Sequence, residues 1–275
     1  MKALLAQART ARAPLAAFTC YTLETALGVI EAAESAAAPT ALMISDASMR
    51  QPTGPRLLAA LVAVAGQARV PVRVQLDHGT DLERIRQALD LGADGVMADG
   101  SRLDDDANAR FVRAAVAAAE RTGAAVEAEL GRIEGDEDLD VAAAAGALTD
   151  PTEAVRFVER TGVDCLAVAV GNVHGSYRRE PRLDWDRLAE IVERVPVAVA
   201  LHGTSGLPAE QVRRARELGV AKFNVNTELR RRHMADLRRS LDRGRDQSGA
   251  DLLGLTATLR QGAFETARAI AFRGA

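Results

Sequence analysis

The sequence predicts a closed (β/α)8 barrel, an α/β TIM barrel with additional C-terminal helices. Eight short apolar runs alternate with helical patterns along the 275 residues, without a linker or a low-complexity tract. The runs are almost continuously apolar, which is typical of parallel strands covered on both faces. The alternative, an open doubly wound sheet, needs a glycine-rich turn after its first strand, and "FTCYTLETA" contains none. We therefore expect one barrel domain over residues 1–275, with terminal helices at about 230–275.

The expected elements follow one another as regular strand–helix units. The strands are expected at residues 15–20, 40–45, 70–76, 95–98, 124–130, 165–170, 197–201 and 221–225. The helices expected between them include residues 81–91, 104–121, 151–160, 184–194 and 208–218. Asp150 before Pro151 is a typical helix start. Gly92, Gly162 and Gly219 each end a helical pattern shortly before the next strand.

Composition excludes several classes of protein. Hydrophobic residues make up 48% of the chain and charged residues 27%, which excludes a disordered chain. Aromatic residues are only 3% and the net charge is −3, so nucleic acid is not an expected partner. No uncharged apolar stretch is long enough to span a bilayer, and Arg9 and Arg12 interrupt the region where a secretory signal needs its apolar core. Cys20 and Cys165 lie in apolar runs and are expected to be buried, reduced thiols, so we expect a cytoplasmic protein.

Three of the four histidines stand at the carboxyl ends of expected strands. His78 follows "VPVRVQLD", His174 follows "LAVAVGNV" and His202 follows "VPVAVAL". Strand ends of a barrel meet at one rim, where three imidazoles can share a catalytic metal ion that keeps an open position. A single histidine is more often a hydrogen-bonded core residue, but three at equivalent positions, each followed by a glycine, favour the metal site. His233 lies in a basic helical pattern and is expected at the surface.

Carboxylates follow the same strand ends. Asp77 precedes His78, Asp99 ends the fourth strand in "MADGS", and Glu129 ends the fifth in "VEAELG". Each is also of a type that caps helices or pairs with arginine, but their placement at successive strand ends favours metal ligation or acid–base catalysis. The stretch 131–149 is acidic and long for a strand-to-helix loop, and loops of that length are usually functional.

Glycines and small polar residues cluster after the sixth, seventh and eighth strands, in "GNVHGSY", "HGTSG" and "NVNT". Barrel enzymes often bind phosphate with the loops after strands seven and eight. Gly203, Thr204 and Ser205 offer backbone N–H groups and hydroxyls, and Asn224 and Thr227 stand on the other side. These loops therefore predict a phosphate site beside the metal site.

A series of motifs, in a fixed order, covers most of the sequence from about Phe18 to Leu229. They are "QLDHG", "MADGS", "VEAELG", "GDED", "LTDP", "TGVDCLAVAVGNVHGSY", "PVAVALHGTSG" and "GVAKFNVNTEL". In this order they resemble the class II, metal-dependent ketose-bisphosphate aldolases, in particular the fructose- and tagatose-bisphosphate group. The resemblance implies a lyase that acts in carbohydrate metabolism, for example in glycolysis. It would reversibly cleave a ketose 1,6-bisphosphate to dihydroxyacetone phosphate and an aldehyde such as glyceraldehyde 3-phosphate.

The resemblance also implies a metal centre and an assembly. His78, His174 and His202 match the ligands of a catalytic Zn²⁺, and Asp99 and Glu129 match carboxylates of an alternative or second metal position. Relatives assemble as dimers or tetramers, so a homo-oligomer is implied.

Roles in catalysis and substrate binding follow from the same resemblance. Asp77 matches the acid–base aspartate at the C4 hydroxyl, and Glu137 matches the loop glutamate that handles the proton of the dihydroxyacetone-phosphate carbon. Relatives also bind a monovalent cation, Na⁺ or K⁺, near their phosphate loops. The residues that match the phosphate site are Gly175, Gly203, Thr204, Ser205, Asn224, Val225, Asn226 and Thr227.

Three alternatives stay open. Thr19 replaces the asparagine usual after "AF", and "SDASMRQPTG" departs from the family pattern after the second strand, so a class II aldolase with a different aldehyde is the first. The second is a Schiff-base aldolase that uses Lys222, the only amine on an expected strand. This alternative gives the three histidines no catalytic role. A non-catalytic sugar-phosphate-binding descendant is the third, and the retained Asp77 and Glu137 argue against it.

Overall fold

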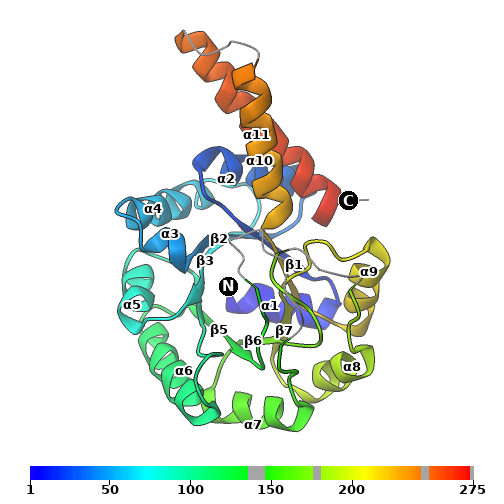
Figure 1. Cartoon of the computed structure of the whole chain (residues 1–275). Helices are drawn as coiled ribbons and strands as arrows, with labels where there is room; N and C mark the ends of the chain where they lie inside the picture. Colours follow the sequence, from blue (N-terminus) through cyan, green and yellow to red (C-terminus); the bar gives the residue numbers. More distant parts are fainter. Residues whose placement is uncertain (136–145, 176–180, 243–247, 273–275) are drawn as a thin grey trace.

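The computed structural model describes residues 1–135, 146–175, 181–242 and 248–272. Within them, parallel strands close into a barrel in sequence order, and β8 pairs back onto β1 (Figure 1). The strands are β1 Leu15–Thr19, β2 Thr40–Ser45, β3 Val72–Gly79, β4 Gly95–Ala98, β5 Ala125–Leu130, β6 Cys165–Val168, β7 Ala198–Leu201 and β8 Lys222–Val225. The predicted barrel is confirmed.

Helices α2 to α9 surround the barrel as an outer ring, whereas α1 lies across one end of it and α10 and α11 extend outward (Figure 1). The helices of the described residues are α1 Lys2–Ala11, α2 Leu23–Ser35, α3 Asp46–Met49, α4 Gly54–Ala65, α5 Leu82–Asp90, α6 Asp105–Glu120, α7 Pro151–Thr161, α8 Trp185–Arg194, α9 Ala209–Leu218, α10 Thr227–Asp242 and α11 Gly249–Ala271. Asp81, Asp104, Asp150 and Asp184 each accept a backbone N–H in the first turn of the helix that follows. These caps explain why the helices begin where the sequence predicts.

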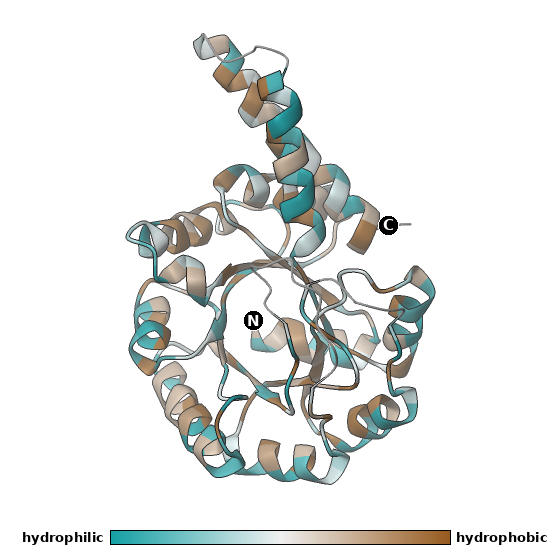
Figure 2. Cartoon of the chain, viewed as in Figure 1, coloured by the Kyte–Doolittle hydropathy of each residue, from teal (hydrophilic) through white to brown (hydrophobic). Residues whose placement is uncertain are grey.

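Apolar side chains fill the barrel from its amino-terminal end. Alanines dominate this interior cluster, with Met43 and Met97 between them. Leu5 and Ala8 of α1 pack against the same cluster, so α1 closes that end of the barrel (Figure 1). A second apolar layer lies between the strands and the outer helices, whose ribbons alternate between hydrophobic and hydrophilic residues in Figure 2. The polar residues inside the barrel therefore gather toward its carboxyl-terminal rim.

The third strand is longer than predicted at its carboxyl end. The sequence predicts its end at Leu76, but β3 continues through Asp77 and His78 to Gly79. Its register against β4 shifts between Leu76 and Gly79, and His78 has a φ of 51°, in the left-handed region that few non-glycine residues adopt. An irregularity of this kind redirects a side chain at a strand end. Asp77 and His78 are thus held by the sheet and not by a loop.

The sixth strand ends at Val168, two residues before the predicted end. The backbone N–H of Ala169 donates to Thr149 Oγ1, and that of Val170 donates to Asn172 Oδ1, each at 2.8 Å. Side chains therefore replace the neighbouring strand as hydrogen-bond partners at this point. Cys20 and Cys165 are buried and free, as predicted. Among the described helices, none combines the length and apolarity needed to cross a membrane.

The C-terminal helices α10 and α11 form a hairpin that extends outward from the barrel (Figure 1). The hairpin is attached because α11 packs along α2. Gly28 of α2 permits this close approach, since an added Cβ would lie 2.3 Å from the Arg260 carbonyl oxygen and 2.7 Å from the Ala263 Cβ. The additional C-terminal helices predicted from the sequence are confirmed.

Gly28→Ala should lower the free energy of unfolding by about 1–3 kcal/mol, because the added methyl group overpacks the α2–α11 contact. Gly254→Ala is the matched control, since its Cβ would meet no atom within 4 Å. That control should be neutral or stabilising by up to about 1 kcal/mol through helix propensity. Urea unfolding of both variants measures the difference. Equal stability of the two variants would contradict the close approach.

Candidate metal centre and active site

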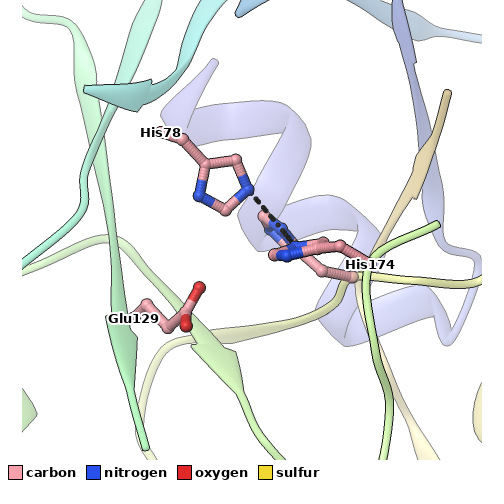
Figure 3. A group of neighbouring side chains, drawn as sticks. His78, Glu129 and His174 are labelled. Carbon is pink, nitrogen blue, oxygen red and sulfur yellow. Dashed lines mark hydrogen bonds between the residues drawn. The ribbon is translucent and has the colours of Figure 1, made fainter. Parts of the chain in front are cut away.

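The structure brings the three predicted histidines to one place at the carboxyl-terminal rim. His78 comes from β3, His174 from the segment after β6, and His202 directly follows β7. The ring centroids lie 4.8 Å apart for His78 and His174, 5.0 Å for His78 and His202, and 5.6 Å for His174 and His202. Figure 3 shows the His78 and His174 rings close together, with Glu129 of β5 facing them.

Carboxylates behind two of the rings decide which nitrogens face inward. His202 Nε2 donates to Glu127 Oε1 at 2.7 Å, and His78 Nδ1 donates to Asp99 Oδ2 at 2.7 Å. A carboxylate only accepts hydrogen bonds, so these nitrogens carry the protons. In the neutral rings, His202 Nδ1 and His78 Nε2 therefore present lone pairs to the centre. Burial, as the largest cause, lowers the pKa of His202 and lowers that of His174 well below its usual range, which favours neutral imidazoles.

The inward nitrogens have the spacing of a tetrahedral metal site. His202 Nδ1 lies 3.2 Å from His78 Nε2 and 3.4 Å from His174 Nε2. Zinc bound to histidine at about 2.0–2.1 Å in tetrahedral geometry separates two ligand nitrogens by about 3.3–3.4 Å. Lone pairs held this close to each other repel unless a cation lies between them. The donor set therefore fits a divalent metal ion.

Glu129 adds a fourth candidate ligand. One ligand atom from each of His78, Glu129, His174 and His202 lies within 4.8 Å of all the others. Glu129 Oε1 accepts the Ile133 backbone N–H at 3.0 Å, whereas the buried Oε2 has no hydrogen-bond partner among the described residues. Burial and then the charge of Asp99 raise the pKa of Glu129 to about 8. A metal cation beside this carboxylate would satisfy the orphaned oxygen and stabilise its ionised form.

Asp77 lies beside the metal centre and is fully buried. Both of its oxygens are 3.4 Å from Asn224 Nδ2 of β8. The same Nδ2 is 3.1 Å from His202 Nε2, so Asp77, Asn224 and His202 form one contiguous group. The rim thus combines a nitrogen set that could bind a metal ion with a buried carboxylate beside it.

Residues 1–270 match the family described as "Fructose-bisphosphate aldolase class-II". The chain belongs to this family. It is therefore an aldolase, a lyase of a metal-dependent family, and its converging histidines and Glu129 are the group that could bind a metal.

Solved structures of other aldolases are similar over nearly the whole chain. The YdjI aldolase from Escherichia coli K12 is 31% identical, with 99% of this chain and 96% of that chain covered and a TM-score of 0.84. A putative fructose-1,6-bisphosphate aldolase from Coccidioides immitis is 33% identical, with the same coverage and a TM-score of 0.84. Fructose-bisphosphate aldolase from Campylobacter jejuni, 19% identical over 96% of this chain and 90% of its own, shares the fold with a TM-score of 0.78.

Asp99 of the aldolase lies behind His78 and outside the group of converging ligand atoms. Its other oxygen accepts from the Ser101 hydroxyl at 2.6 Å. Although burial alone raises the pKa of Asp99, the hydrogen bond and charge of His78 outweigh it and hold that pKa well below its usual range. In this arrangement Asp99 orients a ligand, and its predicted role at a second metal position stays a prediction.

Glu127 and Gln75 were missed by sequence analysis, and Lys222 was considered only as a Schiff-base lysine. Glu127 Oε2 lies 2.8 Å from Lys222 Nζ and 3.2 Å from Gln75 Nε2, and all three residues are buried inside the barrel. The sequence does contain a signal for these three residues. Each stands two positions before another polar residue in an otherwise apolar strand, in "QLD", "EAE" and "KFN". Residues two apart share one face of a strand. Both members of each pair therefore enter the barrel.

The loops that the sequence assigns to phosphate lie at the same rim, but several of their side chains bond to other protein groups or point into the barrel. Thr204 Oγ1 donates to the Asn224 carbonyl at 2.6 Å, and the Ser205 hydroxyl donates to Glu228. The Asn224 side chain points into the barrel. Its amide nitrogen faces Asp77, and its amide oxygen accepts from Lys222 Nζ. Val225 packs its side chain into the outer apolar layer.

Three further loop residues complete the predicted set. Asn226 hydrogen-bonds to the Tyr21 hydroxyl, and Thr227 begins α10. Gly203 has a φ of 65°, and a Cβ there would lie 2.0 Å from the Val173 carbonyl oxygen, so this turn requires glycine. Gly175 also has a positive φ, of 78°. Glu137 lies outside the described residues.

His174→Ala should abolish metal binding, because it removes one of the three inward nitrogens. Metal analysis of the purified aldolase should show about one ion per chain in the wild type and almost none in the variant. His233→Ala is the control: this histidine is half-buried against α2, not at the surface as predicted, with Nδ1 3.5 Å from Thr25 Oγ1. Retention of metal by His174→Ala would contradict the proposed ligand set.

Proposed function

We propose that this aldolase is zinc-dependent and reversibly cleaves a ketose 1,6-bisphosphate of the fructose or tagatose type. The products are dihydroxyacetone phosphate and an aldehyde such as glyceraldehyde 3-phosphate. One observation carries the proposal: three histidines converge, with His202 Nδ1 3.2 Å from His78 Nε2 and 3.4 Å from His174 Nε2, beside a buried carboxylate, Asp77. This combination supplies both a metal site and a base.

His78, His174 and His202 would hold the zinc ion, and Glu129, which faces the same group, would serve an alternative or second metal position. Nitrogen ligands at this spacing, with a coordination position left for substrate, favour zinc. When bound, zinc supplies Lewis-acid stabilisation of the negative charge that develops on the substrate during carbon–carbon cleavage. Glu127 and Asp99 keep two of the rings in the required tautomer.

Asp77 is proposed as the base for the cleavage step. Its carboxylate takes the proton of the C4 hydroxyl while the C3–C4 bond breaks, and the C4 oxygen becomes the carbonyl of the aldehyde product. Asn224 Nδ2, 3.4 Å from both carboxylate oxygens, orients Asp77 for this transfer. Glu137 is proposed to return a proton to the dihydroxyacetone-phosphate carbon.

The loops after β6, β7 and β8 are proposed to bind the phosphate of dihydroxyacetone phosphate. The positive φ angles of Gly175 and Gly203 form tight turns at the rim, where consecutive backbone N–H groups can face an anion. Na⁺ or K⁺ is proposed to bind beside this phosphate and to offset its charge. The partner of the aldolase is thus a small sugar phosphate, and the enzyme is proposed to act as a homo-oligomer.

A second candidate is a class II aldolase that joins dihydroxyacetone phosphate to a different aldehyde. The segment after β2 favours it, because this segment forms α3 and departs from the family pattern. Asp46 there accepts hydrogen bonds from both Arg50 and Arg84, at 2.7 Å each. These guanidinium groups are already paired with a carboxylate, which argues against a second substrate phosphate as their partner.

Release of dihydroxyacetone phosphate from fructose 1,6-bisphosphate and tagatose 1,6-bisphosphate tests the proposal. We expect cleavage of one of them, loss of this activity after chelation, and recovery with zinc. A zinc-containing enzyme that cleaves neither sugar would support the second candidate. Cleavage that persists in fully metal-free protein would refute the zinc-dependent mechanism.

Asp77→Ala should keep its zinc and lose turnover by about 10²–10⁴-fold, the usual contribution of a general base. Metal content and the circular dichroism spectrum, measured on the same sample, distinguish loss of the base from loss of the centre. A fully active Asp77→Ala variant would assign the C4 proton to another group.

A further inference from the structure

Lys222 is a lysine of β8 whose ammonium group is completely buried. Its Nζ lies 2.8 Å from Glu127 Oε2 and 2.6 Å from Asn224 Oδ1, with Met43 Sδ at 3.9 Å. A buried ion pair loses its hydration and is often no more stabilising than apolar side chains of the same volume. Stability alone therefore does not account for a lysine at this position.

The contact with Lys222 decides how the Asn224 amide is oriented. An ammonium group has only donors, so it must face the amide oxygen, Oδ1. The amide nitrogen then faces Asp77, whose carboxylate only accepts. A reversed amide would place donor against donor at Lys222 and acceptor against acceptor at Asp77. Both ends of the amide therefore favour the same orientation.

Glu127 holds the ammonium group in place. Its Oε2 is shared by Lys222 and by Gln75 Nε2, and its Oε1 accepts from His202 Nε2. The carboxylate is thus held by partners from two strands, β3 and β8, and from the segment after β7. Lys222 contacts the oxygen of the Asn224 amide and Asp77 contacts its nitrogen, so the amide connects the ammonium group to the base.

We propose that Lys222 is a positioning residue of the aldolase reaction. Its ammonium group fixes the Asn224 amide so that the amide N–H groups face Asp77 and hold this carboxylate in place for the C4 hydroxyl proton. The inference rests on the proposed function and deepens it. Loss of the ammonium group should impair cleavage, which needs Asp77, and should spare proton exchange at the dihydroxyacetone-phosphate carbon, which does not.

The test compares two double variants in which the buried charges are both removed. Lys222→Met alone would leave Glu127 as an unpaired buried charge and endanger folding. Lys222→Met/Glu127→Gln removes the charge pair together with the donor to Asn224. Lys222→Gln/Glu127→Gln is the matched control, because glutamine has a volume close to that of methionine and restores an N–H donor. Residue 127 is the same in both variants, so the partner of His202 is unchanged.

With zinc saturating, kcat for cleavage should be about 10- to 100-fold lower in the methionine variant than in its glutamine control, as for a misplaced catalytic group. KM, zinc affinity by chelator competition, and solvent proton exchange of dihydroxyacetone phosphate should agree between the two variants within about threefold. Equal kcat values would overturn the proposal. So would a parallel loss of cleavage and exchange, which indicates a merely structural role.

Crystal structures of the two double variants test the same point without turnover. The Asn224 amide should lose its contact with Asp77 in the methionine variant and keep it in the glutamine control. An unchanged Asn224–Asp77 contact in the methionine variant would overturn the inference whatever the substrate proves to be. Failure of the wild type to cleave either ketose bisphosphate would instead contradict the proposed function alone.

Discussion

Eight parallel strands closed into a ring place every second side chain in an interior that has no room for bulk water. Every polar group there must find its partner across the barrel, because an unpaired buried group is costly. Gln75, Glu127 and Lys222 come from three different strands and satisfy one another. The metal centre rests on this polar layer. The layer therefore determines which ring nitrogen of His202 faces the metal and which end of Asn224 faces the base.

The convergence of the histidines could be predicted from the sequence because it needs only the number and direction of the strands. Once eight parallel strands close, His78, His174 and His202 must share a rim, wherever each strand begins. Glu127 could not be assigned in the same way. It is two residues from Glu129 on the same strand face, and one meets Lys222 and His202 while the other faces the metal centre. Such partners depend on the stagger between strands, which short apolar runs do not reveal.

Local backbone geometry explains the remaining differences between expectation and structure. The register shift near His78 extends β3 beyond its apolar run and brings Asp77 into the sheet. The polar motif around Asn224 predicts a phosphate ligand at the end of the expected strand, whereas its side chain turns toward the barrel interior. The alternation of a strand continues through the motif, so Asn224 points inward and Val225 outward.

The metal centre is unequally exposed. Glu129, His174 and His202 are buried, whereas His78 is only half-buried and stands on a strained turn of β3. A metal ion held by this group would therefore be open to solvent mainly on its His78 side. The group combines one ligand within reach of water with three that water does not reach, contributed from four separate positions around the ring.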